Sequence, residues 1–220
     1  MPRIPHLNPP YSAPVEAALS VMHPRNSPVD PLKLFRTMAR NLPLGSAMAQ
    51  LGPYMLGRSA NFDMRSREVV IDRVTARCGC EYEWGVHVAG YAKRVGLTED
   101  QIYATVHGDA ADPCWSEKDA ALVAMVDQLH DTGHVSEEVW NRLADHFSAD
   151  GLMELLVLTG WYHAISFLAN GAQVEREDWA PRFPARRTAC QLGRAGGRDR
   201  PDPGHLRGRR DHSYRKQLQI

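Results

Sequence analysis

The 220-residue sequence predicts an all-α fold, and three observations support this prediction. Apolar residues recur at steps of three and four along most of the chain, which is the spacing of one helix face. Successive segments each open on a residue suited to cap a helix and close at a glycine or proline. No repeat of roughly 20 to 50 residues stands out, which argues against a solenoid. We therefore expect helices packed against helices.

An extended segment and three helices are predicted at the amino-terminal end. Residues 1–11 hold four prolines in their first ten positions and are expected to run extended. Helices are expected to begin at Ser12 and at Asp30, and a third to span 46–56. Asp30 suits the cap of the second helix and Pro31 its first helical position. Together these helices are expected to form a cover.

The segment SREVVIDRVTAR is predicted to be a helix capped by Ser66. Its β-branched residues leave a strand as the alternative. We favour the helix because charged residues fill the face that the apolar residues leave, at helical spacing. The apolar residues are Val69, Val70, Ile71 and Val74, and the charged residues are Arg67, Glu68, Asp72 and Arg73.

The following helix boundaries are marked by local signals. A helix over 81–95 is expected to stop at Gly96, a residue that readily adopts the left-handed conformation. Thr98 and Gln101 then form a capping-box pattern for the next helix. Further helices are expected to start at Ser116, at Ser136, and at Ser148 or Asp150.

Charge and composition divide the chain into a helical domain, 12–183, and a basic tail, 184–220. Residues 1–183 carry 16 Lys and Arg against 23 Asp and Glu, whereas 184–220 carry 10 against 3. The acidic body argues against nucleic acid as a partner, because phosphate binding needs a basic surface. The tail is rich in Arg, Gly and Pro, so we expect it to be disordered and solvated.

Four irregularly spaced cysteines and the lack of a charged and then apolar leader argue against a secreted disulfide scaffold, so we expect a cytoplasmic protein. No uninterrupted apolar run approaches the roughly 18 to 20 residues that cross a bilayer. The segment 151–171 is broken by Glu154, Gly160 and His163 and is interpreted as a buried helix of a soluble protein. The cysteines are Cys78, Cys80, Cys114 and Cys190.

The stretch from Glu68 to His87 gathers the candidate catalytic side chains. If Gly79 breaks one helix and another begins near Cys80, then Cys80, Glu83 and His87 share one stripe at about 100° per residue. Glu68 lies on the preceding helix and can join them if the two helices pack together. These four residues are the predicted catalytic group.

A thiol near a helix amino terminus has a lowered pKa, and His87 could accept the Cys80 proton, as in nucleophilic or peroxidatic cysteines. The alternative is that Cys80 is a small buried hydrophobic residue. Zinc held by Cys80, Glu83 and His87 is a further alternative, but a fourth ligand is not assigned. We expect no metal and no cofactor. Tyr82 and Trp84 are expected to line the core or the substrate pocket.

The other histidines give weaker signals. His107, His130, His134 and His146 fall at surface-like or helix-end positions without a partner pattern. His163 could be either a core histidine or a support for the site. Cys78 and Cys80 form a C-x-C pair rather than the C-x-x-C of thioredoxin-like redox motifs.

The run REVVIDRVTARCGCEYEWGVHVAGYAKRVGLTEDQI resembles the signature segment of the carboxymuconolactone decarboxylase family, which includes the AhpD-like alkylhydroperoxidases. The Tyr82, Trp84 and His87 pattern is similar to one branch of that family. The resemblance implies an all-helical fold assembled into trimers or hexamers. It also implies that Glu68, Cys80 and His87 match members of a proton relay.

The second cysteine of the AhpD pattern falls on Glu83, so the redox dithiol is absent. The sequence therefore favours a cofactor-free acid and base set acting on a small organic acid or lactone, by decarboxylation or a related proton transfer. His87 is then the general acid or base, Glu68 and Glu83 orient it or relay protons, and Cys80 supports it. A thiol peroxidase using Cys80 and a helical oligomer that binds a ligand without turnover remain alternatives.

Overall fold

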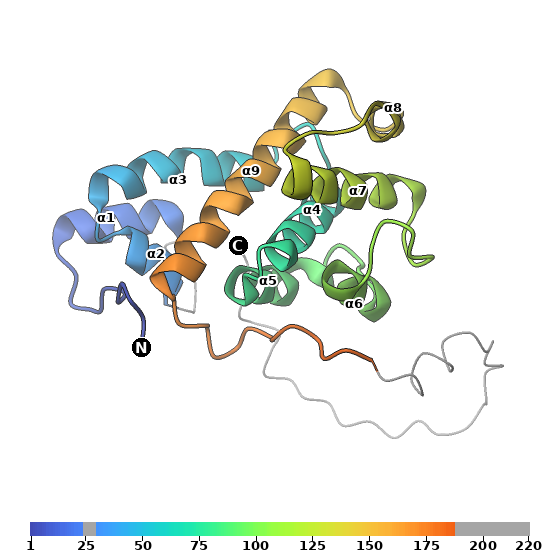
Figure 1. Ribbon diagram of the computed structural model, residues 1–220. Coiled ribbons are helices and arrows are strands. Elements are labelled where there is room, and N and C mark those ends of the chain that lie inside the picture. Colours follow the sequence, from blue (N-terminus) through green and yellow to red (C-terminus); the bar gives the residue numbers. More distant parts are fainter. Residues whose placement is uncertain (24–29, 188–220) are drawn as a thin grey trace.

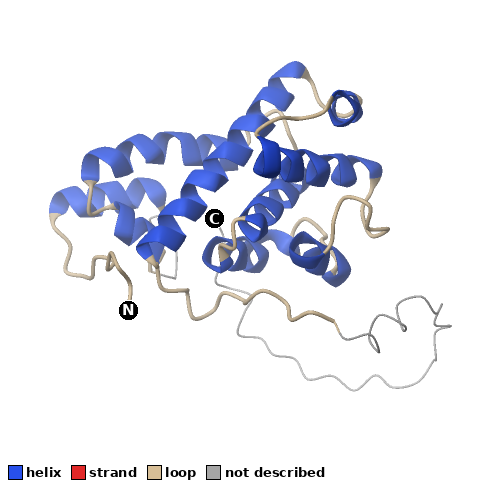
Figure 2. Cartoon of the chain, in the orientation of Figure 1, coloured by secondary structure: helices blue, strands red, loops and turns tan. Residues whose placement is uncertain are grey.

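A computed structural model describes residues 1–23 and 30–187, and these residues form helices and no strands (Figures 1 and 2). The predicted all-α class is confirmed over the described residues. In chain order the elements are α1 (Ala13–Met22), α2 (Lys33–Met38), α3 (Leu42–Leu56), α4 (Met64–Arg77), α5 (Glu81–His87), the π-helix η1 (Val88–Ala92), α6 (Glu99–His107), α7 (Glu117–Thr132), α8 (Glu137–Ala144) and α9 (Ala149–Ala172).

Helix α4 is the central helix of the fold. It packs against α5, α6, α7 and α9, and its apolar residues between Val69 and Val74 are fully buried. Its charged face is buried as well, and Arg67, Glu68 and Arg73 find hydrogen-bond partners on neighbouring helices and loops. The Arg73 guanidinium, for example, donates to both Asp127 carboxylate oxygens at 2.7 and 2.8 Å and to the Thr105 carbonyl at 3.0 Å. Both faces of α4 therefore belong to the interior.

Most helix starts agree with the local signals. Thr98 and Gln101 form the predicted capping box. The side chains of Ser116, Ser136 and Ser148 each accept the backbone N–H of the third residue beyond them. At these positions the cap bond is local, which explains why the sequence was sufficient to predict it.

Two predicted caps are wrong. Helix α4 begins at Met64 and is capped by Asp63, whose carboxylate accepts the Ser66 N–H at 2.7 Å. Helix α2 begins at Lys33 rather than at Asp30 and Pro31. The Lys33 N–H donates to Glu177 at 2.6 Å, so its partner comes from 144 residues further along the chain.

The helix predicted over 81–95 changes character at His87. Helix α5 ends there and continues as η1, in which the wider turn carries an extra residue. The chain reaches α5 through Gly79 at φ 61° and leaves the helical region through Gly96 at φ 70°. Both glycines adopt the left-handed conformation, which is nearly free of strain for that residue type.

Helix α9 runs between the group α1 to α3 and the group α4 to α8 (Figure 1). Among the described helices it is long and apolar enough, by length and composition, to cross a membrane. Half of its most apolar window is buried inside the protein, as expected of a core helix. Leu155 and Leu158, for instance, are fully buried.

The segment 174–187, which follows α9, lies in an extended conformation across α5 and α6 (Figure 1). The Phe183 N–H donates to Glu81 at 3.0 Å, and the Pro184 carbonyl accepts from the His107 ring at 2.6 Å. Residues 184–187 of the predicted tail are thus described in the structure, where side chains of α6 bind the backbone of Pro184 and Arg187. The remainder of the predicted tail, with Cys190, lies outside the described residues.

Candidate active site

The packing of α5 against α4 brings Glu68 and His87 into direct contact. A Glu68 carboxylate oxygen lies 2.7 Å from His87 Nδ1, and both side chains are at most 4% exposed. The carboxylate can only accept, so Nδ1 carries a proton and donates it. The sequence predicted a shared site only if the helices of Glu68 and His87 pack together, and this contact is present.

The other ring nitrogen of His87 faces Glu83 and Tyr162. Tyr162 Oη lies 3.0 Å from His87 Nε2, and Glu83 Oε1 lies 3.6 Å from the same atom. Tyr162 comes from α9, 75 residues beyond His87. Sequence reasoning missed Tyr162 as a site residue, because no local spacing connects it with the α5 residues.

The two carboxylates keep His87 protonated. Although burial opposes the charged ring, Glu68 and Glu83 outweigh it and raise the pKa of His87 to about 10. Burial, Glu83 and Glu68 together raise the pKa of Tyr162 well above its usual value. At neutral pH the site therefore presents an imidazolium beside a neutral phenol.

Arg67 is the second positively charged residue in contact with Glu68. Its Nε donates to Glu68 Oε1 at 2.6 Å, and its Nη1 donates to the Leu56 carbonyl at 2.6 Å. The guanidinium carbon also lies 5.0 Å from the centre of the Tyr91 ring. Glu68 is consequently held between two cations, Arg67 and His87, and neither of its oxygens is left without a donor.

Glu83 differs from Glu68 because one of its oxygens has no partner. Glu83 Oε2 is buried and receives no hydrogen bond among the described residues, while the side chain is 9% exposed. Glu83 also lines the large cavity described next. Because the side chain keeps some exposure beside the cavity and its charge lacks a donor on one oxygen, the Glu83 carboxylate can serve as a proton acceptor for a bound molecule.

A cavity of about 360 Å³ opens onto this group. It lies between the amino-terminal helices α1 to α3 and the residues of α5, η1 and α9, so those first helices cover the site as predicted. Apolar side chains dominate its wall, and its described lining contains no Lys or Arg. The polar groups at its inner end are Glu83, His87, Tyr91 and Tyr162. Its size and lining are those of a small-molecule site.

Cys80 does not line this cavity. It is the N-cap residue of α5 with φ −91° and ψ 78°, so Cys80 lies outside the helix and does not share the predicted stripe with Glu83 and His87. Its side chain is fully buried in an apolar cluster with Leu34, Val86 and Ile165. Burial raises the pKa of the Cys80 thiol to about 11. The lowered pKa expected from the helix terminus is therefore wrong, because desolvation of the thiolate outweighs the helix dipole.

Tyr82 and Trp84 are also absent from the cavity lining. Each lies about 100° around α5 from Glu83, which turns both side chains into the core instead. Tyr82 donates to Glu177 at 2.8 Å, and Trp84 donates to Thr105 at 3.0 Å. Of the two interpretations given for Tyr82 and Trp84, the structure agrees with the core, where both residues are buried and support α5.

Asp72 is a buried acid that sequence reasoning did not single out. It lies one turn beyond Glu68 on α4, is 1% exposed, and neither carboxylate oxygen has a hydrogen-bond partner among the described residues. Burial and the nearby Glu68 raise its pKa well above the usual range. The helical spacing of four from Glu68 was the signal that could have revealed it.

The alternative zinc set of Cys80, Glu83 and His87 does not fit this geometry. His87 Nδ1 is bound to Glu68 and Nε2 faces Tyr162, which leaves neither nitrogen for an ion shared with Cys80. Cys78, Cys80 and Cys114 are free thiols. The three-residue group that could hold a metal among the described residues lies elsewhere, at Cys78, His130 and His163.

The described residues form an all-helical fold that is similar to several solved structures. The debrominase Bmp8 has a similar structure, with a TM-score of 0.65 at 15% identity over 80% of this chain and 92% of the debrominase. A peroxidase-related protein from Silicibacter sp. TM1040 gives 0.66 at 12% identity, over 82% and 96%. A protein of unknown function from Agrobacterium tumefaciens, whose description names the antioxidant defence protein AhpD, gives 0.53 at 20% identity, over 60% and 88%.

Residues 43–127 match the model of the carboxymuconolactone decarboxylase family. This confirms the resemblance predicted from the sequence, and the matched segment contains Glu68, Glu83 and His87. No curated protein matches the sequence.

Proposed function

We propose that this protein is a cofactor-free acid and base catalyst that moves a proton next to the carbonyl group of a small, apolar molecule. The observation that carries this proposal is the end wall of the cavity. There Glu83 Oε1 and the Tyr162 hydroxyl lie 3.6 and 3.0 Å from His87 Nε2, and Glu83 Oε2 has no hydrogen-bond partner among the described residues. A base and two donors at one end of an apolar cavity are the groups that enolisation requires.

The proposed reaction assigns a different task to each group. The carboxylate of Glu83 removes the proton on the carbon beside the carbonyl, and the electron pair of that bond moves onto the carbonyl oxygen. His87 Nε2–H or the Tyr162 hydroxyl donates to the resulting enolate oxygen. Glu83, now a carboxylic acid, returns the proton to the same or a conjugated carbon. Glu68 holds the imidazolium in its charged form throughout.

The cavity charge favours neutral substrates, such as lactones, over di-acids. Its described lining contains no Lys or Arg, and the nearby Arg67 is already bound to Glu68. A substrate carboxylate beside Glu83 would be opposed by a like charge with few cations to compensate it. Decarboxylation of an organic acid through a dienolate uses the same donors and is therefore the second version of this proposal.

Isomerisation of α-angelica lactone tests the proposal, because this small neutral lactone shifts its double bond through a dienolate. We expect the wild-type protein to accelerate the shift and Glu83→Gln and His87→Gln each to reduce the rate about 10²- to 10⁴-fold. Glu99→Gln, an exposed glutamate on α6, is the matched control and should keep the wild-type rate. Equal rates for wild type, Glu83→Gln and His87→Gln would contradict the assignment.

The two alternatives receive less support from the geometry. A peroxidatic Cys80 must reach a hydroperoxide, but this thiol is fully buried and away from the cavity. Hydroperoxide reduction that disappears in Cys80→Ser and survives in Cys114→Ser would favour that alternative. An oligomer that binds a ligand without turnover would be favoured if the lactone bound without isomerising.

A further inference from the structure

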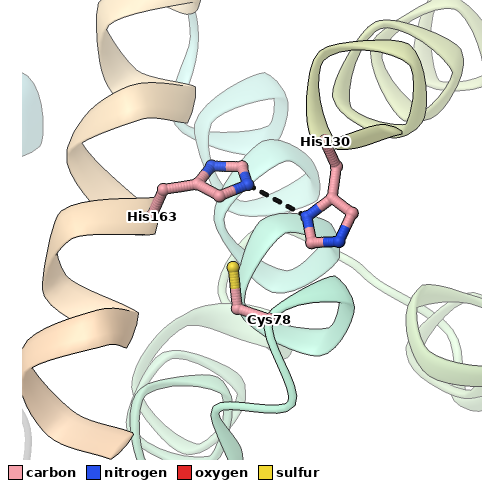
Figure 3. Close-up of side chains that lie close together, drawn as sticks. All are labelled: Cys78, His130 and His163. Carbon is pink, nitrogen blue, oxygen red and sulfur yellow. Dashed lines mark hydrogen bonds between the residues drawn. The ribbon is translucent and has the colours of Figure 1, made fainter. Parts of the chain in front are cut away.

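A second cluster of reactive side chains lies away from the cavity, where the end of α4 meets α7 and α9. Cys78 is the C-cap residue of α4, His130 lies in the last turn of α7, and His163 lies in the middle of α9. One ligand atom of each, the Cys78 sulfur and a nitrogen of each ring, lies within 4.8 Å of the others. The three side chains lie close together (Figure 3), all are partly buried, and none lines the cavity.

Hydrogen bonds orient the two imidazole rings. His163 Nδ1 lies 2.9 Å from the Thr159 carbonyl oxygen, which can only accept, so Nδ1 carries the proton and Nε2 carries a lone pair. That lone pair accepts from His130 Nδ1 at 3.0 Å. A backbone carbonyl that fixes the outer nitrogen of a histidine is the usual support of a metal-binding ring.

Cys78 is fixed to the same helix as His163. The Asn170 side-chain amide on α9 donates to the Cys78 carbonyl at 2.9 Å, and the Cys78 N–H donates to the Val74 carbonyl at 2.9 Å. Figure 3 shows the sulfur turned toward the space between the two rings. The three potential ligands therefore come from three packed helices, which limits how far each can move.

We propose that Cys78, His130 and His163 form a zinc site with a water molecule as the fourth ligand. One thiolate and two imidazoles are ligands that Zn²⁺ prefers, whereas Mg²⁺ and Ca²⁺ prefer oxygen. Zinc bonds of about 2.0–2.1 Å to nitrogen and 2.3 Å to sulfur place tetrahedral ligand atoms within 4 Å of one another. The observed separations, with an upper limit of 4.8 Å and 3.0 Å between the rings, need only small side-chain rotations.

Binding changes the protons of two ligands. The Cys78 thiol releases its proton to water and binds as the thiolate. His130 moves its proton from Nδ1 to Nε2, so that Nδ1, which donated to His163, presents a lone pair to the ion. His163 keeps its proton on Nδ1 and its bond to Thr159. One proton is released for each ion bound.

The spacing of these residues along the chain gave no indication of this site. His130 was assigned to a helix end without a partner, and 33 residues separate it from His163. No run of the sequence places the three in a zinc-binding spacing. Only the packing of α4, α7 and α9 brings them together.

Cobalt and zinc titrations of the full-length, metal-free protein test the site. Added Co²⁺ should give an absorption band for sulfur-to-cobalt charge transfer together with intense visible bands of a tetrahedral ion. Cys78→Ser should abolish the charge-transfer band, and His130→Gln or His163→Gln should weaken Zn²⁺ binding about 100-fold or more. The matched controls Cys114→Ser and His134→Gln should bind as the wild type does.

Alkylation of the wild-type protein gives an independent measurement that needs no variant. Stoichiometric Zn²⁺ should slow iodoacetamide labelling of Cys78, followed by peptide mass spectrometry, and leave labelling of Cys114 in the same molecules unchanged. The proposal is overturned if the cobalt spectrum lacks the sulfur band, if Zn²⁺ binding survives loss of His163, or if Cys78 labels at the same rate with and without Zn²⁺.

Discussion

At the scale of single residues, the site depends on an alternation of charge. Four buried side chains follow one another in contact, positive and negative in turn: Arg67, Glu68, His87 and Glu83. Each charge is compensated by its neighbours except at Glu83 Oε2, where the series ends at the cavity. The free end of the series is thus the carboxylate assigned as the base.

Replacing Glu68 by Gln should lower the pKa of His87 from about 10 toward its ordinary value, because the largest stabilising charge is lost. Because His87 binds its proton more tightly in the folded than in the unfolded chain, its contribution to stability is fully present below about pH 6.5. This stabilisation is lost as the pH rises to about 10, since the unfolded chain releases the proton first. Between these limits, deprotonation of His87 should lower the free energy of unfolding of the wild type by about 1.4 kcal/mol per pH unit. We therefore expect a smaller decrease per pH unit in Glu68→Gln.

Nuclear magnetic resonance titration of the His87 ring nitrogens measures this pKa directly. Glu99→Gln, which removes an exposed carboxylate on α6, should leave the titration unchanged. A wild-type ring that titrates near pH 6.5, or a Glu68→Gln ring that titrates near pH 10, would contradict the proposed charge set.

At the scale of elements, α5 is held in place by the extended segment that follows α9. Gly85 permits this contact, because a side-chain carbon at that position would overlap the Pro181 carbonyl oxygen and crowd Ala180. Trp84 packs edge-on against Phe183 with ring centres 5.2 Å apart, and Tyr82 binds Glu177. The segment 174–187 therefore packs against the face of α5 that is opposite to the cavity-lining residues.

Gly85→Ala should displace this segment and reduce the free energy of unfolding by about 1–3 kcal/mol, as expected of an overpacked site. Gly171→Ala is the matched control, because among the described residues nothing beyond its chain neighbours and its own stretch of α9 backbone lies within 4 Å of its added carbon. That change should be neutral or stabilise α9 by up to about 1 kcal/mol. Urea unfolding of both variants measures the difference. Equal free energies of unfolding for the two variants would show that the segment does not pack closely against Gly85.

The elements also show where sequence-based prediction succeeds and where it fails. The caps at Thr98 and Ser116 were predictable, because donor and acceptor lie three residues apart. The start of α2 was not, because its partner is Glu177. The burial of Cys80 was not either, because its apolar neighbours Leu34 and Ile165 come from α2 and α9. Glu68, Glu83 and His87 were predictable from one segment, whereas Tyr162 required the packing of α9.

At the scale of the whole molecule, an exposed apolar face remains on α9. Met153, Val157 and Phe167 are 59%, 43% and 65% exposed and recur at helical spacing with the exposed Gly160 and Ala164. Large exposed apolar faces mark interaction sites, and the small residues allow another helix to approach closely. The family resemblance predicts a homo-oligomer, and we expect this face to contact a second copy of the chain.

Val157→Glu should therefore dissociate the predicted oligomer, because burying an unpaired carboxylate in the contact costs about 2–5 kcal/mol. Leu44→Glu is the matched control, since Leu44 is 53% exposed on α3, on another part of the surface. Sedimentation equilibrium of the wild type should give a multiple of the chain mass, as should Leu44→Glu, whereas Val157→Glu should shift toward the monomer. A monomeric wild type, or a Val157→Glu protein of unchanged mass, would show that α9 does not form the contact.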